Sequence, residues 1–130
     1  MAKKRIMMID DEEHFLKLAK LNLEATGSYE VLTLSSAENI IAHVHRFKPD
    51  VILLDLLMPS MGGLEACEAL NNDETGRKIP VIIISALDKE KDKLKAFKLG
   101  VVDYLTKPID IKMMVAVIEK ALRGFDQLKA

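Results

Sequence analysis

The sequence predicts an α/β fold: a doubly wound parallel sheet of five strands, built as five successive βα units, (βα)5. Short apolar runs recur along the chain, and the segments between them space their apolar residues as amphipathic helices do. A length of 130 residues suits one domain. Because βα units connect with a right-handed crossover, five of them form one open sheet, and the strand order 2-1-3-4-5 is a common solution.

The expected strands are the short apolar runs. The first, third and fourth runs show no alternation, which is typical of strands covered on both faces of a parallel sheet. The second and fifth contain polar residues, which indicates edge strands. In chain order the runs are Ile6–Ile9, Val31–Leu34, Val51–Leu54, Val81–Ile84 and Val101–Leu105.

Turn-forming residues mark the ends of the first two expected helices. The first helix covers residues 12–26 and ends at Gly27. Ser35 and Glu38 have the spacing of a capping box, which predicts the start of the second helix. This helix must end before Pro49, because proline disfavours a helical conformation in the residue before it.

The third and fourth helices have similar signals. Gly62 or Gly63 opens the third helix, which ends near Asn72. Asp88 is a candidate N-cap for a lysine-rich fourth helix that ends at Gly100.

Asp110 is the expected cap of the last helix, whose apolar residues fall on one stripe. The stripe comprises Ile111, Met114, Val115, Ile118 and Leu122. We therefore expect a single domain over residues 1–130, with a core over about 4–122 and a short tail over 123–130. Its strand order would be the flavodoxin-like one.

Composition argues against several classes of function. With 19 basic and 20 acidic residues the net charge is -1, so no global basic field favours nucleic acid or a membrane surface. The apolar run Ile6–Ile9 is too short for a signal peptide or a membrane span. Cys67 is the single cysteine and is expected to be buried; it agrees with a reducing, cytoplasmic location.

The candidate residues for a ligand site follow four of the five expected strands. In a doubly wound sheet, ligands bind beyond the carboxyl ends of the strands, at the point where the strand order reverses. This rule predicts a site between the first and third strands. Its candidate residues are Asp10 and Asp11, Asp55, Ser85, and Lys107 with Pro108.

Three carboxylates at one edge of the sheet, from Asp10, Asp11 and Asp55, repel one another and need either a compensating cation or a raised pKa, and a divalent metal is the expected answer. Mg²⁺ prefers oxygen ligands and commonly binds one or two carboxylates together with phosphate, so it is the expected metal, with Mn²⁺ as an alternative. The three histidines fall on helical segments and do not complete a zinc site.

Asp55 can act as a nucleophile toward a phosphoryl group and form an acyl phosphate. The charge on the transferring group must then be stabilised. We expect the metal to bind one oxygen and Lys107 a second. The Ser85 hydroxyl and the Ala86 backbone N–H would bind the third.

Four segments together resemble the response-regulator receiver domains of two-component signal transduction, the CheY-like family. The resemblance extends from about residue 4 to about residue 122. The matching segments are Ile9–Glu12, Leu54–Gly63, Ile84–Ala86 and Asp103–Pro108.

The resemblance implies a phosphoprotein that signals within a phosphorelay, a switch rather than an enzyme with a separate substrate. A histidine kinase or histidine phosphotransfer protein would donate the phosphoryl group, and the domain would catalyse its own phosphorylation and dephosphorylation. The implied roles are Asp55 as phosphoacceptor, Asp11 and Asp55 as direct metal ligands with the Leu57 backbone carbonyl, Asp10 as a ligand through metal-bound water, and Ser85 and Lys107 as phosphate ligands.

The resemblance also implies a conformational switch. Tyr104 would turn inward when the Ser85 hydroxyl moves toward the phosphoryl group. This would change the surface formed by the last two helices and the fifth strand, which binds a downstream protein. The Lys107–Pro108 peptide bond is expected to be cis.

The first helix has apolar residues over more than half of its circumference. Either it has a broad core face, or its exposed side binds the histidine-bearing helices of a partner. Under the second interpretation the docking candidates are His14, Phe15 and Leu18.

Three departures or substitutions qualify the resemblance. Met61-Gly62-Gly63 lacks the acidic residue that many members have before the third helix, so that loop would be looser. Val117 stands where some members have an arginine that pairs across a dimer, which argues against that dimer. Leu57 and Leu87, two residues after Asp55 and Ser85, have two interpretations. Either they exclude the hydrolytic water, which predicts a long-lived phosphorylated form, or they pack against neighbouring residues and leave the rate of hydrolysis to other features.

Three alternatives remain open at this point. A haloacid-dehalogenase-like phosphohydrolase needs a second aspartate where Leu57 stands, and a flavin site is disfavoured because four acidic residues, 10–13, follow the first strand. A pseudo-receiver that binds partners without phosphorylation would lack a site residue, and none is missing. The residues after Leu122 are too few for an output domain, which fits either a stand-alone receiver or part of a larger regulator.

Overall fold

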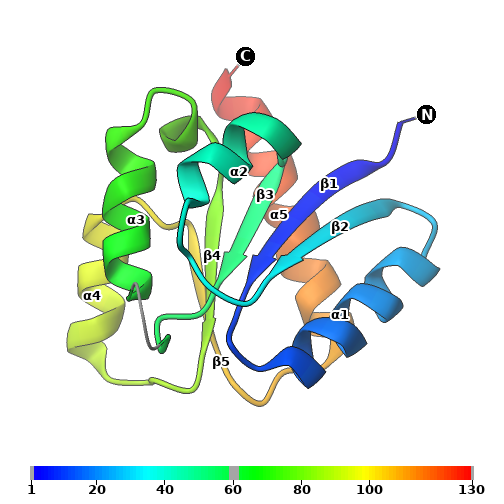
Figure 1. Cartoon of the computed structure of the whole chain (residues 1–130), viewed down its shortest axis with the longest axis horizontal. Coiled ribbons are helices and arrows are strands. Elements are labelled where there is room, and N and C mark those ends of the chain that lie inside the picture. Colours follow the sequence, from blue (N-terminus) through cyan, green and yellow to red (C-terminus); the bar gives the residue numbers. More distant parts are fainter. Residues whose placement is uncertain (1, 59–61, 130) are drawn as a thin grey trace.

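The computed structural model describes residues 2–58 and 62–129, which form one parallel sheet flanked by helices (Figure 1). The strand order is β2-β1-β3-β4-β5, which confirms the predicted order and the predicted edge strands. The strands are β1 Lys4–Ile9, β2 Tyr29–Leu34, β3 Val51–Leu54, β4 Val81–Ser85 and β5 Asp103–Thr106. The helices are α1 Glu13–Ala25, α2 Ile40–Phe47, α3 Gly63–Asn72, α4 Glu90–Lys98 and α5 Ile111–Lys129, with a short 3₁₀ helix η1 at Gly76–Lys78.

Both faces of the sheet are covered, and this divides the core into two layers. Alternate residues of a strand face opposite sides. On β1, Ile6 and Met8 pack with α1 and α5, whereas Met7 and Ile9 pack with α2, α3 and α4. Figure 1 shows these two groups of helices on either side of the sheet. The double burial explains why the central strands are apolar without alternation.

Residues with positive φ end three of the helices where the sequence predicted an end. Gly27 and Gly100 have φ values of 81° and 95° and follow α1 and α4. Lys48, with a φ of 55°, ends α2 just before Pro49. The predicted cap of α5 is also confirmed, because the Met113 N–H donates to Asp110 Oδ1 at 2.8 Å.

Two predicted N-caps are wrong. The capping box of Ser35 and Glu38 does not form: the Glu38 N–H donates instead to Ser36 Oγ at 3.1 Å, and α2 begins at Ile40 after Asn39, whose φ is 58°. A local turn thus uses the Glu38 N–H, which in a capping box would donate to Ser35. Asp88 does not cap α4, which begins at Glu90 without a side-chain hydrogen bond at its start.

Two element boundaries also differ from the prediction. β5 begins at Asp103 rather than Val101, because the chain joins the sheet only where the Val102 N–H donates to the Val81 carbonyl at 2.8 Å. α5 continues past Leu122 through Lys129.

Within residues 2–58 and 62–129, no helix has the length and the apolar character needed to cross a membrane.

Candidate functional site

The carboxyl ends of β1 and β3 place two acidic residues side by side. Ile9 is paired with Leu54 in the sheet, and the Asp55 N–H donates to the Ile9 carbonyl at 3.0 Å. Asp10 and Asp55 therefore occupy equivalent positions, directly after two neighbouring strands. These strands adjoin where the strand order reverses, which is the position that the sequence predicted for the site.

Asp10 and Asp55 are buried, with 2% and 4% exposure, whereas Asp11 is exposed. Carboxylate oxygens of all three lie within 4.8 Å of one another. Burial raises the pKa of Asp10, although hydrogen bonds from Lys107 and the Glu12 backbone oppose the shift. Such a cluster needs a cation beside it.

Backbone N–H groups hold both buried carboxylates in place. Asp10 Oδ1 accepts from the Glu12 N–H at 2.9 Å, and Asp55 Oδ1 accepts from the Leu57 N–H at 3.0 Å. In both cases the turn after the strand orients the carboxylate of the aspartate that directly follows the strand. One oxygen of each carboxylate is left to face the centre of the cluster.

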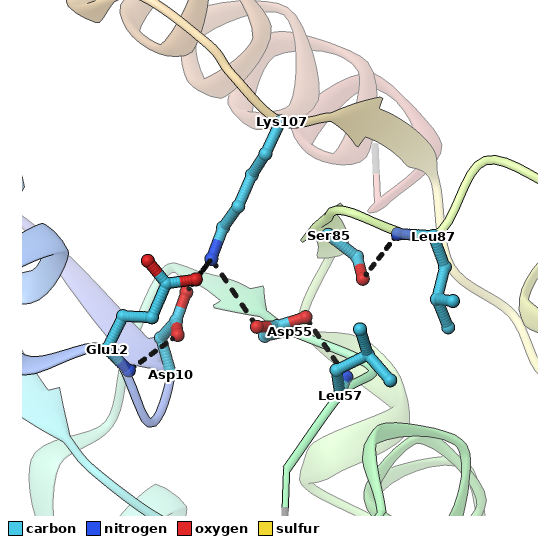
Figure 2. A network of polar contacts seen from close by, with 7 residues as sticks. All are labelled: Asp10, Glu12, Asp55, Leu57, Ser85, Leu87 and Lys107. Atoms are coloured by element: carbon cyan, nitrogen blue, oxygen red, sulfur yellow. Dashed lines mark hydrogen bonds and ion pairs between the residues drawn. The ribbon is translucent and has the colours of Figure 1, made fainter.

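Lys107 supplies a positive charge to the cluster (Figure 2). Its Nζ lies 2.7 Å from Asp10 Oδ2 and 3.4 Å from Asp55 Oδ2. It also lies 3.0 Å from Glu12 Oε1. Burial acts to lower the pKa of Lys107, but its hydrogen bonds with Asp10 and Glu12 outweigh burial and raise the pKa above its ordinary range. Lys107 is therefore charged at neutral pH.

The residues present fit a hard divalent cation. Asp10, Asp11 and Asp55 offer oxygen donors only, close enough together to share one ion. Lys107 balances one of these negative charges, so the cluster stays net negative. Oxygen donors and residual negative charge are what Mg²⁺ prefers.

Ser85 and Tyr104 are linked through one residue of the loop that follows β4. Ser85 is fully buried, and its Oγ accepts from the Leu87 N–H at 3.3 Å. The Tyr104 hydroxyl donates to the Leu87 carbonyl at 2.6 Å. Burial, and then the charge of Asp92, raises the pKa of Tyr104. Leu87 thus connects the predicted phosphate ligand to the predicted switch residue.

Other predicted residues surround this centre. Ala86 is exposed directly after Ser85, and the Lys107–Pro108 peptide bond is cis. The side chains of Leu57, which is 48% exposed, and Leu87, which is half-buried, lie on the side of Asp55 away from Lys107 (Figure 2).

The three docking candidates on α1 differ in exposure. His14 is exposed and Leu18 is 62% exposed. Phe15 is half-buried, packs against the core under α1 and α5, and has the Nζ of Lys107 4.6 Å from its ring centroid. Leu21, which is 68% exposed, extends the apolar surface of α1. The helix therefore has both a core face and an exposed apolar side.

Three contributors to the site were not predicted: the ion pair of Glu12 with Lys107, the ring of Phe15, and Gly63. A Cβ on Gly63 would overlap the Asp55 carbonyl oxygen and the Leu56 Cα. The consecutive glycines at positions 62 and 63 are the sequence feature from which this close approach of backbone segments could have been predicted. The loop predicted to be looser includes residues 59–61, which lie outside the described residues.

The chain is similar to known proteins in both sequence and structure. The family model of the response regulator receiver domain matches residues 6–119. "Response regulator PleD" of Caulobacter vibrioides is 40% identical over 119 residues, which cover 92% of this chain and 26% of PleD. "Protein PilH" of Pseudomonas aeruginosa is 35% identical over 120 residues, which cover 92% of this chain and 98% of PilH.

The structural comparison supports the same fold. The crystal structure of Vibrio cholerae chemotaxis protein CheY4 superimposes with a TM-score of 0.87, over 93% of this chain and 100% of that chain. Its sequence identity is 22%, so this likeness concerns the fold alone. Because the chain spans only about a quarter of PleD, it corresponds to one part of that relative.

Proposed function

The chain belongs to the response regulator receiver domain family of two-component systems, and we propose that it accepts a phosphoryl group on Asp55 from a histidine kinase or histidine phosphotransfer protein. One observation carries the proposal. Asp55 is a buried carboxylate at a strand end, with a lysine ammonium 3.4 Å away and a second buried acid beside that ammonium. The cluster combines a nucleophile with the positive charge that phosphoryl transfer requires.

In the proposed step a carboxylate oxygen of Asp55 attacks the phosphorus, and the bond from phosphorus to the histidine nitrogen of the donor breaks. The Leu57 N–H holds Asp55 Oδ1 and so orients the carboxylate. Mg²⁺, or Mn²⁺ in its place, neutralises phosphoryl charge when bound. Asp11, Asp55 and the Leu57 backbone carbonyl would hold it directly, and Asp10 through water.

Lys107, Ser85 and the Ala86 backbone N–H would bind the phosphoryl oxygens. Lys107 already lies between the two buried acids, so it needs only a small displacement to reach a group on Asp55. Ser85 follows the neighbouring strand, on the side of Asp55 away from Lys107 (Figure 2). The two side chains would therefore hold the phosphoryl group from opposite sides.

Phosphorylation would change the protein surface through the contacts that connect Ser85 to Tyr104. When the Ser85 hydroxyl turns to donate to a phosphoryl oxygen, the Leu87 N–H loses its acceptor. The Leu87 carbonyl, which binds the Tyr104 hydroxyl, then shifts with the loop. Tyr104 lies on β5 between α4 and α5. When Tyr104 moves, the surface formed by α4, β5 and α5 changes. This change alters the binding of a downstream protein.

Other parts of the proposal concern partners and location. His14, Phe15 and Leu18 on α1 are the docking candidates for the phosphoryl donor. The balance of 19 basic and 20 acidic residues supports a domain that does not itself bind nucleic acid or a membrane. The single cysteine, Cys67, supports a cytoplasmic location.

Phosphate uptake from acetyl phosphate tests the proposal. Wild type should incorporate one phosphoryl group in the presence of Mg²⁺ and none with EDTA, whereas Asp55→Asn, nearly isosteric but a poor nucleophile, should stay unmodified. Asp11→Asn should bind Mg²⁺ more weakly, because a charged ligand is lost. Phosphate on Asp55→Asn at the wild-type level would exclude Asp55 as the acceptor. A wild type that remains unmodified would indicate a pseudo-receiver.

A further inference from the structure

The ammonium group of Lys107 has a neighbour to which the proposed reaction assigns no role, the ring of Phe15. The Nζ lies 4.6 Å from the ring centroid. A cation at this distance over an aromatic face is attracted to it, and more strongly when water is excluded. The Lys107 side chain is only 12% exposed, so this contact is largely shielded from water.

We infer that Phe15 is a positioning residue: its ring keeps the Lys107 ammonium over the two buried acids, where a phosphoryl group on Asp55 requires it. The inference rests on the proposed function of Asp55. It adds a group on α1 to a site otherwise built from strand ends and the loops that follow them.

Opposing attractions make such positioning necessary. Glu12 Oε1 lies 3.0 Å from Lys107 Nζ, and the Glu12 side chain is 62% exposed. This carboxylate draws the flexible lysine side chain toward solvent. Asp10 attracts the same ammonium inward and, like Asp55, is almost completely buried. Any further attraction from the buried, inner side of the ammonium therefore favours the position in which Lys107 lies over Asp10 and Asp55.

The Phe15 ring lies on that inner side. It packs against the core under α1 and α5. A cavity of about 10 Å³ is lined by Phe15 together with Asp10 and Asp55, so the ring borders the same small space as the two buried acids. An aliphatic side chain at position 15 would fill the core but would lack the attraction for a cation.

The placement is tested first in the unphosphorylated protein, by NMR of the lysine Hε protons. Protons over an aromatic face shift upfield through the ring current. The Lys107 Hε signal, assigned by its loss in Lys107→Ala, should lie upfield of the other lysines in wild type. It should remain there in Phe15→Tyr and move to the ordinary position in Phe15→Leu. A signal that Phe15→Leu leaves unchanged would overturn the inference.

The role is tested next by titration with fluoroberyllate, a phosphoryl analogue, in the presence of Mg²⁺. Phe15→Leu should bind it about fivefold more weakly than wild type, which corresponds to about 1 kcal/mol, the size of a partly shielded cation–π contact. Phe15→Tyr should restore the affinity because it keeps the ring. Leu21→Ala, which alters an exposed residue of the same helix, should bind as wild type does.

The outcomes separate this inference from the proposed function. Binding by wild type that Asp55→Asn abolishes, together with equal or tighter binding by Phe15→Leu, would contradict the role of Phe15 alone. Absence of binding by wild type would contradict the proposed function of Asp55, and with it any role of Phe15 in that function.

Discussion

At the scale of single residues, Lys107 allows two buried carboxylates to lie next to each other. Asp10 and Asp55 would repel each other strongly in a buried setting. The Lys107 ammonium lies within 3.4 Å of both. Burial acts to lower its pKa, but hydrogen bonds with Asp10 and Glu12 outweigh burial and raise the pKa, so Lys107 is charged at neutral pH. In the proposed function the same ammonium also binds the phosphoryl group on Asp55.

The lifetime of the phosphorylated form depends, in our account, on Leu57 and Leu87. Their side chains lie on the side of Asp55 away from Lys107 (Figure 2). Hydrolysis needs a water molecule in line with the acyl-phosphate bond, and leucine side chains cannot orient one. The double variant Leu57→Asn/Leu87→Glu should therefore lose phosphate roughly tenfold faster than wild type, a barrier lower by about 1.4 kcal/mol.

The measurement is the decay of phosphorylated protein after removal of the phosphoryl donor, without any phosphatase. Leu94→Asn is a matched control, because Leu94 is 58% exposed on α4. It should decay at the wild-type rate. Equal or slower decay of the double variant would show that the two leucines do not limit hydrolysis.

Cys67 gives a prediction for pH dependence. Burial raises the pKa of its thiol from 9.0 to about 12. A group whose pKa is raised on folding stabilises the folded state fully below its unfolded pKa, and this contribution is lost as the pH rises toward the folded value. The wild type should therefore lose stability relative to Cys67→Ala as the pH rises above 9.0.

The free energies of unfolding of the two proteins, measured below and above pH 9.0, check this expectation. Their difference should be constant below that pH and change in favour of Cys67→Ala above it. In native protein, iodoacetamide should also react far more slowly with Cys67 than in denaturant. A pH-independent difference would contradict the raised pKa.

At the scale of the elements, the start of α3 is fixed by contact with the backbone that carries Asp55. The Gly63 N–H donates to the Leu56 carbonyl at 3.2 Å, and a Cβ at Gly63 would overlap backbone atoms of Asp55 and Leu56. Gly63→Ala should lower the free energy of unfolding by about 1–3 kcal/mol, as overpacking does. It should also shift the amide NMR signals of Asp55 and Leu56.

The neighbouring glycine offers a matched control. At Gly62, whose φ is -64°, the nearest atom to an added Cβ is Glu65 Oε1 at 3.9 Å, so there is room for a side chain. Gly62→Ala should change stability by no more than about 0.5 kcal/mol. If both variants were equally stable, the proposed close approach of α3 to the Asp55 backbone would be wrong.

The strands and most helix ends could be predicted from the sequence, whereas the helix starts were less predictable. Central strands are recognised because burial on both faces requires apolar residues throughout, and helix ends because Gly27 and Gly100 adopt positive φ. The start of α2 was missed because Ser36, rather than Ser35, forms the local hydrogen bond. Short polar turns offer several competing bonds, and the sequence does not rank them.

At the scale of the whole molecule, the topology explains how much of the site was predictable. Parallel strands direct all of their carboxyl ends to one edge of the sheet, so residues that follow different strands converge there. The acids, Ser85 and Lys107 could be nominated on this basis. Glu12 and Phe15 could not be nominated in this way. Their contacts with Lys107 depend on the direction in which the Lys107 side chain extends across the edge of the sheet, and on how α1 packs beside it.

The central claim is that Asp55, among the clustered acids, carries the phosphoryl group. Borohydride reduces an aspartyl phosphate to homoserine, so treatment after incubation with acetyl phosphate and Mg²⁺ marks the acceptor in the peptide mass spectrum. We predict homoserine at position 55 and unchanged aspartate at Asp10 and Asp11. Homoserine at either of those positions, or an unmodified Asp55 in a protein that has taken up phosphate, would contradict the account.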